Sequence, residues 1–252
     1  LLANRLSADP NITVLLLEAG GRDDWIWTKI PVGYLYCINN PRTDWCFKTE
    51  AEEGLNGRSI IYARGKVLGG CSSINAMIYM RGQARDYDEW ARSTGDSSWR
   101  WENVLPLFKK SEDYYRGADA AHGSGGEWRV EQQRLSWEIL NAYRSAMIEA
   151  GIPPTDDFNR GDNEGCGYFL VNQRRGVRLN TARAFLHPIA TRSNLTVLTE
   201  AHVQKLRFEG RRCTGVEFAR GGRGEIALSA IETILAAGSI GSPQILQLSG
   251  VG

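Results

Sequence analysis

The run Thr13-Val14-Leu15-Leu16-Leu17-Glu18, followed by Ala19-Gly20-Gly21, sets the fold class. It is apolar on both faces, which is typical of a central parallel strand covered by helices on each side. Leu2 and Leu6 share one face of a predicted helix that ends at residues 7–11 and leads into this strand. A helix followed by such a strand is the second half of a β-α-β unit. We therefore predict an α/β fold with some α+β elements.

The last quarter of the chain, from residue 195, has a different pattern. Short apolar runs separated by turns predict an antiparallel meander over residues 195–198, 203–208, 214–218 and 225–228, with a glycine-rich hairpin turn at 221–224. A further buried strand is predicted at 233–237, and Ser242-Pro243 indicates the start of a helix. Other helices are predicted over 74–80, 86–91, 103–111 and 137–150, the last capped by Ser136, and a mobile loop over 117–126.

Composition excludes several classes of protein. The 252 residues contain 30 Lys and Arg against 29 Asp and Glu, so the net charge of +1 gives no basic stripe for nucleic acid. No stretch approaches the ~18 uncharged apolar residues of a membrane-spanning helix. Five widely spaced cysteines without a Cys-x-x-Cys pair indicate reduced thiols and no metal site. With no visible signal peptide, we expect a cytoplasmic protein, and peripheral membrane association stays open. The chain does not begin with Met, which indicates a fragment.

Glu18 is the first candidate site residue. A carboxylate at the carboxyl end of the second strand of a β-α-β unit can accept both hydrogen bonds from a ribose diol. Its charge would also repel a 2′-phosphate. The alternative is a solvated glutamate at a strand end, and spacing alone does not exclude it.

The turn Gly65-Lys66-Val67-Leu68-Gly69-Gly70-Cys71-Ser72-Ser73 is the second candidate. The pair Gly69-Gly70 lets backbone amides approach an anion, and the predicted helix that follows would present its positive N-terminus. Such a site suits a pyrophosphate. It is not a Walker motif, because no Gly-Lys-Ser/Thr sequence occurs. The alternative is a glycine-rich connection that packs two elements tightly.

The residues around this turn resemble a known family. Arg64 to Tyr79 is similar to the first signature of the glucose–methanol–choline (GMC) flavoprotein oxidoreductases, and Gly238 to Gly252 is similar to the second. The pieces between them that also match are 16–21, Asp44-Trp45, 86–90 and 181–186. The resemblance therefore covers essentially the whole chain. Within the family, the chain is most similar to the branch of choline and alcohol dehydrogenases.

The resemblance implies a Rossmann-like FAD-binding domain with an antiparallel meander, interleaved with a substrate-binding domain. It divides the chain into an FAD-binding part at 1–86, a mainly substrate-binding part at 87–194 and a second FAD-binding part at 195–252. Glu18 would hold the adenosine ribose of FAD, and the main chain of Val203 would meet the adenine. The other implied FAD contacts are Val67, Gly69, Gly70, Cys71 and Ser72 on the pyrophosphate and flavin side, Asn75, Ala76, Met77 and Ile78 along the isoalloxazine, and Ala237 and Gly238 in the second signature.

Two departures from the family pattern matter. Some relatives bind FAD covalently through a histidine, and Ile74 occupies that position here, so non-covalent FAD is expected. Members also carry a Gly-x-Gly-x-x-Gly turn upstream and a catalytic histidine downstream of the matched segments. Neither is in this chain, and His122, His187 and His202 do not match the catalytic position. No catalytic residue is therefore assigned within these residues, and the three histidines are expected to be surface or structural residues.

The resulting prediction is an FAD-dependent oxidoreductase that oxidises the CH–OH group of a small-molecule alcohol to an aldehyde. Hydride would pass to flavin N5, and electrons would then pass to an acceptor such as a quinone or oxygen. Two alternatives remain. The chain could be a non-catalytic, truncated remnant of such an enzyme, or a nicotinamide-dependent dehydrogenase, which fits Glu18 but not the two signatures.

Overall fold

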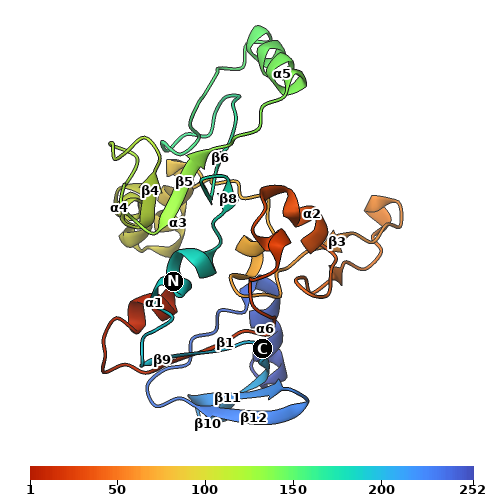
Figure 1. Ribbon diagram of the computed structural model, residues 1–252, viewed down its shortest axis with the longest axis vertical. Helices are drawn as coiled ribbons and strands as arrows, with labels where there is room; N and C mark the ends of the chain where they lie inside the picture. The colour runs from red at the N-terminus through yellow and green to blue at the C-terminus, as the bar shows by residue number, and fades with distance from the viewer. The chain divides into compact units, whose positions relative to one another are not determined.

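The computed structural model describes residues 1–252, which form two compact units. Unit 1 comprises Leu1–Asp23, Asn39–Gly70 and Ile189–Gly252, and unit 2 comprises Asp24–Ile38 and Cys71–Pro188. Each unit is thus assembled from segments that are distant in sequence (Figure 1). The predicted domain boundaries after residues 86 and 194 stay a prediction.

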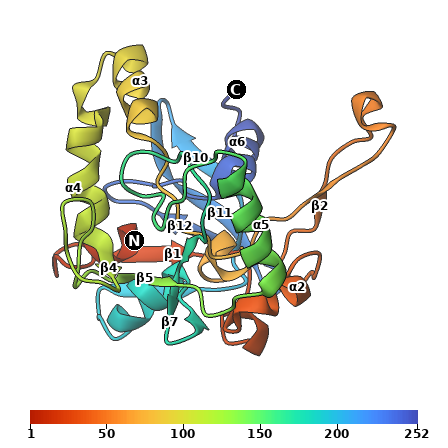
Figure 2. The same cartoon turned by 90° about the horizontal axis from the view of Figure 1, so that it is seen from above.

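Unit 1 contains two main sheets. The parallel pair β1–β9 aligns Val14 with Leu195 and Leu17 with Leu198, and the antiparallel sheet has the order β10-β11-β12. A short pair, β2–β3, carries a loop that extends away from the rest of the unit (Figure 2). The elements are α1 (Leu2–Leu6), β1 (Val14–Leu17), β2 (Phe47–Lys48), the 3-10 turn η3 (Glu53–Leu55), β3 (Ile61–Tyr62), β9 (Leu195–Leu198), β10 (His202–Glu209), β11 (Arg212–Arg220), β12 (Arg223–Leu228) and α6 (Gly238–Leu248).

The core of unit 1 lies between the antiparallel sheet and α6. Leu206, Val216 and Phe218 from the sheet pack with Ile245 from the helix, and Leu17 from β1 packs against this cluster. The amide of Leu206 also donates to Ser249 Oγ at 2.7 Å, just after the helix ends. Apolar burial and this hydrogen bond therefore fix α6 on β10.

Three predictions in this unit are wrong. Residues 195–198 belong to the parallel sheet instead of the meander, because the hydrogen bonds of β9 go to β1. Residues 233–237 have no strand partner and are largely exposed, so the apolar run forms no buried strand. Helix α6 begins at Gly238 and runs through Pro243, because a proline can occupy a helix where the loss of one backbone hydrogen bond is tolerated.

Unit 2 is built around the small sheet β4-β5-β6 and two helices, α3 and α4, that pack through aromatic residues. Helix α5 has no buried residue and lies apart from this sheet (Figure 1). The elements are η1 (Ile26–Thr28), η2 (Pro31–Gly33), α2 (Tyr34–Cys37), α3 (Ala84–Thr94), η5 (Ser97–Trp99), α4 (Trp101–Ser111), β4 (Glu112–Tyr114), β5 (Trp128–Gln132), α5 (Glu138–Glu149), β6 (Leu170–Val171), β7 (Gln173–Arg174), β8 (Val177–Arg178) and the π-helical turn η6 (Ala182–Leu186). The turns η4 (Gly70–Ser73) and η7 (His187–Ile189) fall at the boundaries of the units.

Two further predictions fail in unit 2. No helix forms over 74–80: a single 3-10 turn, η4, is followed by a turn, a bend and irregular backbone. The reason is local, because Asn75 Oδ1 accepts from the Met77 amide at 2.9 Å and the Tyr79 amide donates to the Leu170 carbonyl at 2.8 Å. These bonds take the place of helical ones. The helix predicted over 137–150 is confirmed as α5, but the predicted cap at Ser136 is wrong. The N-cap residue is Trp137, and no side chain caps the helix.

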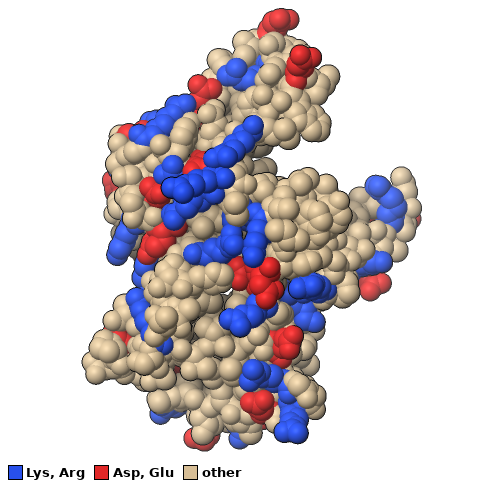
Figure 3. All heavy atoms as spheres, in the orientation of Figure 1, with Lys and Arg blue, Asp and Glu red and all other residues tan.

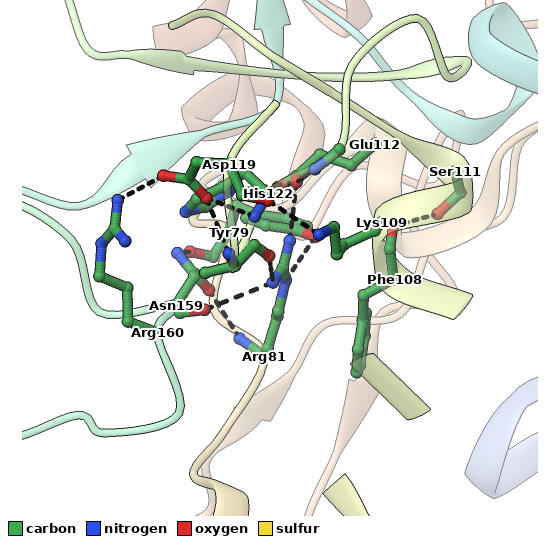
Figure 4. A network of polar contacts seen from close by, with 12 residues as sticks. Tyr79, Arg81, Phe108, Lys109, Ser111, Glu112, Asp119, His122, Asn159 and Arg160 are labelled. Carbon is green, nitrogen blue, oxygen red and sulfur yellow. Dashed lines mark hydrogen bonds and ion pairs between the residues drawn. The ribbon is translucent and has the colours of Figure 1, made fainter. Parts of the chain in front are cut away.

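A buried ionic network holds the loops around β4 (Figure 4). His122 is fully buried, with Nδ1 3.1 Å from Glu112 Oε1 and Nε2 2.7 Å from Asp157 Oδ2. Arg81 Nη2 lies 2.7 Å from Glu112 Oε2. The predicted loop over 117–126 is confirmed as irregular, yet it is anchored at His122, which is a structural residue.

The exposed charges are mixed in sign. On the face in Figure 3, Lys and Arg side chains lie beside Asp and Glu side chains. No helix is long and apolar enough to cross a membrane. No disulfide forms among Cys37, Cys46, Cys71, Cys166 and Cys213.

Candidate functional site

Glu18 follows β1 directly and is partly buried. Its Oε1 accepts from the Gly20 amide at 2.7 Å. Burial raises the pKa of Glu18 to about 7, although the Gly20 amide and the charge of Lys66 oppose this shift. The group therefore changes charge near neutral pH, and a ligand that donates hydrogen bonds to it would favour the ionised form.

The glycines after Glu18 bring the glycine-rich turn against β1. A Cβ at Gly20 would collide with the Lys66 carbonyl, so only glycine allows this close approach. Gly21 pairs with Val67 in a parallel bridge, and the Leu68 amide donates to the Gly21 carbonyl at 2.9 Å. Unit 1 thus places the side chain of Glu18 and the start of the turn next to each other.

The predicted adenine-side residue lies beside the same strand end. The Ala201 amide donates to the Glu18 carbonyl at 2.9 Å, and Val203 follows in β10. The side chain of Val203 packs against the core of unit 1. The contact of its main chain with adenine stays a prediction.

Two glycines of unit 1 leave open space beside the backbone. Gly70 and Gly238 have φ of 53° and 83°, and a Cβ at either would meet no atom within 4 Å. Gly69 has a φ of 90°. Gly238 opens α6 and Ala237 is its N-cap, so the free amides of an 11-residue helix begin here. Backbone amides that a flat or anionic group can approach closely fit a dinucleotide.

In unit 2 the predicted flavin-side residues follow one after another. Cys71 and Ser72 lie in η4, and the exposed residues Asn75, Ala76 and Ile78 come after it. Met77 is buried and has a φ of 64°, a left-handed conformation that is uncommon for a residue with a side chain. The bond from its amide to Asn75 Oδ1 holds this conformation. Because no helix follows Ser73, the predicted helix N-terminus for the pyrophosphate is absent at this turn.

Sequence reasoning missed the residues that support the turn. In unit 1 the buried carboxylate of Asp44 accepts amide hydrogen bonds from Asn39, Cys46 and Arg64, at 2.6, 3.1 and 2.9 Å. These bonds fix the chain that leads into the glycine-rich turn. The signal in the sequence was Asp44-Trp45, a pair that matched the family but was given no role.

The support in unit 2 comes from residues that follow β8. Asn180 Nδ2 donates to Ser73 Oγ at 2.9 Å, and the Thr181 amide donates to Ser72 Oγ at 2.9 Å. Thr181 was also within a matching piece. Two of the three histidines make contacts of other kinds: His202 packs edge-on against Trp45, and both nitrogens of His122 bind carboxylates.

A parallel strand that ends in a carboxylate beside a glycine-rich turn is typical of α/β proteins with a Rossmann-like arrangement, a class that binds nucleotides. Comparison with known families makes this specific: the model of the GMC oxidoreductases matches residues 14–252, and the chain belongs to this family. The predicted family and fold class are confirmed.

The similar proteins are oxidoreductases. An alcohol dehydrogenase [acceptor] of Pseudomonas putida is 41% identical over 254 residues, covering 100% of this chain and 46% of that protein. An oxygen-dependent choline dehydrogenase of Staphylococcus aureus is 41% identical over 256 residues, covering 100% of this chain and 45% of that protein. The crystal structure of pyridoxine 4-oxidase from Mesorbium loti superposes with a TM-score of 0.95 at 34% identity, covering 100% of this chain and 49% of that one. The chain therefore spans about half the length of these relatives.

Proposed function

We propose that the protein containing this chain is an FAD-dependent oxidoreductase that converts a small-molecule alcohol to an aldehyde. The observation that carries the proposal is the contact between the segment after Glu18 and the glycine-rich turn, with open backbone at Gly70. It is supported by the 41% identity to an alcohol dehydrogenase and a choline dehydrogenase. A solved FAD-dependent oxidoreductase from Chaetomium thermophilum also superposes on this chain with a TM-score of 0.90 at 29% identity.

Four of the predicted residues bind the two ends of the dinucleotide's ADP part in this proposal. The ionised Glu18 carboxylate accepts hydrogen bonds from the ribose diol, and the main chain of Val203 borders the adenine. The open space beside the backbone at Gly70 and Gly238 lets the pyrophosphate approach closely. Bound FAD supplies a hydride acceptor, and the protein supplies binding and orientation.

The segment after the turn would border the isoalloxazine. Asn75 holds Met77 in its left-handed conformation, and the Met77 carbonyl accepts from the Asn172 amide, so residues 75–78 keep a fixed conformation. Preorganised backbone groups need no rearrangement when charge develops on a ligand. We assign no residue of this chain as the catalytic base.

We further propose that FAD is bound without a covalent link. Ile74, at the position where some relatives carry a histidine, is a buried alkyl side chain and has no atom that can bond to the flavin. Denaturing the purified holoprotein with acid should release all flavin into the supernatant, where its absorbance measures it. Flavin that stays with the precipitate would overturn this assignment.

The test of the proposed function uses the protein as its source cell makes it. The purified protein should show a flavin absorbance spectrum. Adding a primary alcohol such as choline or benzyl alcohol in the absence of oxygen should bleach this spectrum. Oxygen and a quinone are then compared as acceptors. A protein that binds NADH and no FAD would favour the nicotinamide alternative, and a flavoprotein that no alcohol reduces would favour the non-catalytic one.

A further inference from the structure

Arg178, the last residue of β8, is a buried cation without an acidic partner. Its side chain is 1% exposed. Nη1 donates to the Ser72 carbonyl at 3.3 Å and to Asn75 Oδ1 at 3.0 Å, and Nη2 donates to the Pro31 carbonyl at 3.2 Å. Nε has no hydrogen-bond partner. All of its acceptors are neutral, so its positive charge is not compensated.

Comparison with Arg81 shows that this arrangement is unusual within the same unit. Arg81 is also buried, but Glu112 lies 2.7 Å from its Nη2. Moving an ion out of water costs several kcal/mol, which a close counter-ion normally offsets. Burial lowers the pKa of Arg178 to about 10, and the ionisable group that opposes this is the thiol of Cys37. At neutral pH the guanidinium therefore remains charged.

Arg178 touches the segment that the proposed function assigns to the flavin. Its two acceptors Ser72 and Asn75 bracket residues 72–75, and Asn75 Oδ1 also binds the Met77 amide. Arg178, Asn180 and Thr181 therefore all bind residues 72–75 from the stretch of chain at the end of β8. Removing Arg178 would leave Asn75 Oδ1 with one donor and the segment with fewer anchors.

We propose that Arg178 is a positioning residue that fixes residues 72–75 and lends them an uncompensated positive charge, which favours the reduced form of bound FAD. This inference rests on the proposed function. Reduced flavin carries more negative charge than oxidised flavin, so a buried cation near its binding segment stabilises the reduced form. The arrangement also explains why a cation is buried here without a carboxylate: the negative charge arrives with the ligand.

The experiment compares the FAD-loaded wild-type protein with R178M, R178K and R175M. Arg175 lies in the same β7–β8 hairpin but is exposed, so R175M removes the same charge without touching residues 72–75. Three quantities are measured: the Kd for FAD, the two-electron reduction potential, and the Kd of sulfite, which adds to oxidised flavin and leaves it negatively charged.

We expect R178M to raise the Kd of sulfite about tenfold. It should also lower the two-electron reduction potential by about 30 mV, which is the same tenfold change for a two-electron couple. R178K retains the charge but cannot serve three acceptors with the same geometry. It should therefore keep sulfite binding within about twofold of wild type and weaken FAD binding about fivefold. R175M should match wild type in all three quantities.

Unchanged sulfite binding and potential in a folded, FAD-loaded R178M would overturn the proposal while leaving the proposed function intact. If R178M does not fold, R178K decides, and wild-type affinity for FAD in that variant would overturn the positioning role. A wild-type protein that contains no FAD would overturn the proposed function and this inference together.

Discussion

Glu18 is a residue whose charge should control ligand binding in the neutral pH range. Its pKa is raised to about 7 by burial, so at pH 6 most molecules carry the neutral acid. Two ribose hydroxyls can both donate only to the ionised carboxylate. FAD binding should therefore tighten roughly tenfold between pH 6 and pH 8, as linkage requires for one group that titrates in this window. Fluorescence titration of the deflavinated protein measures the Kd for FAD at each pH.

The raised pKa of Glu18 has the opposite effect on folding stability from its effect on FAD binding. Because the folded-state pKa of Glu18 lies above its model value of 4.5, its contribution to stability falls as the pH rises from there through about 7. Glu18→Gln should bind FAD more weakly and without this pH dependence, whereas Glu209→Gln, at an exposed position in β10, should behave like wild type. An affinity that is equal at pH 6 and pH 8 in the wild-type protein would contradict the role of Glu18.

His122 is a second residue with a predictable pH response. Burial lowers its pKa, but hydrogen bonds and charge from Asp157 and Glu112 outweigh burial and raise it overall. The stabilising contribution is therefore complete below the ordinary histidine pKa and is lost as the pH rises through the folded-state value. Urea unfolding at pH 6 and pH 9 should show this loss.

Removing His122 leaves two carboxylates without their shared partner. His122→Gln should lower the free energy of unfolding at pH 6 by about 3–5 kcal/mol, the usual effect of breaking a buried ion pair. His202→Gln, at an exposed histidine, is the matched control. Equal stability of the two variants at pH 6 would show that the network contributes little.

Residue roles differed in how far the sequence could predict them. Glu18 was found because its position at the end of an apolar strand has chemical meaning, and Gly70 because its neighbours form a motif. Arg178 and His122 were not found as buried partners. Their ionic and polar contacts join segments up to 147 residues apart, and no local pattern encodes such pairings.

At the scale of elements, the antiparallel sheet of unit 1 depends on one glycine. A Cβ at Gly215 in β11 would collide with the Ala227 carbonyl of β12, and its φ of 151° also disfavours a side chain. Gly215→Ala should therefore lower the free energy of unfolding by about 1–3 kcal/mol through overpacking. Gly224 pairs with Ala219 in the same sheet, and a Cβ there meets nothing within 4 Å.

Gly224→Ala is thus the control, and it should change stability by less than about 0.5 kcal/mol. Thermal unfolding of the two variants, followed by circular dichroism, gives the comparison. If both glycines tolerate alanine equally, the close contact between β11 and β12 does not constrain the sheet.

Elements with a strong local pattern were predicted, and those that depend on distant partners were not. The hairpin between β11 and β12 was confirmed because Gly221 and Gly222 adopt positive φ, as the turn requires. The strand at 195–198 was placed in the wrong sheet, since pairing with β1 is a non-local choice. The helix predicted over 74–80 failed because Asn75 binds the Met77 amide locally.

At the scale of the whole chain, apolar side chains remain exposed on an open edge. β12 is the edge strand of its sheet, and Ile226, Leu228 and the nearby Ile231 are 57%, 79% and 78% exposed. An edge strand with apolar side chains pairs readily with another chain. The 252 residues expressed alone should therefore self-associate in a concentration-dependent way, measurable by light scattering.

The double variant Ile226→Lys and Leu228→Lys separates this edge from other causes of association. Both side chains lie on one face of β12 and are exposed, so lysines there should reduce association while leaving the unfolding midpoint within a few degrees of wild type. Lysine at edge positions opposes strand pairing by desolvation and by charge repulsion between copies. If the double variant associates as strongly as the unmodified chain, the exposed apolar surface responsible lies elsewhere, for example on α5, where Ile139 is 69% exposed. A chain that stays monomeric at every concentration would instead show that these exposed groups do not drive association.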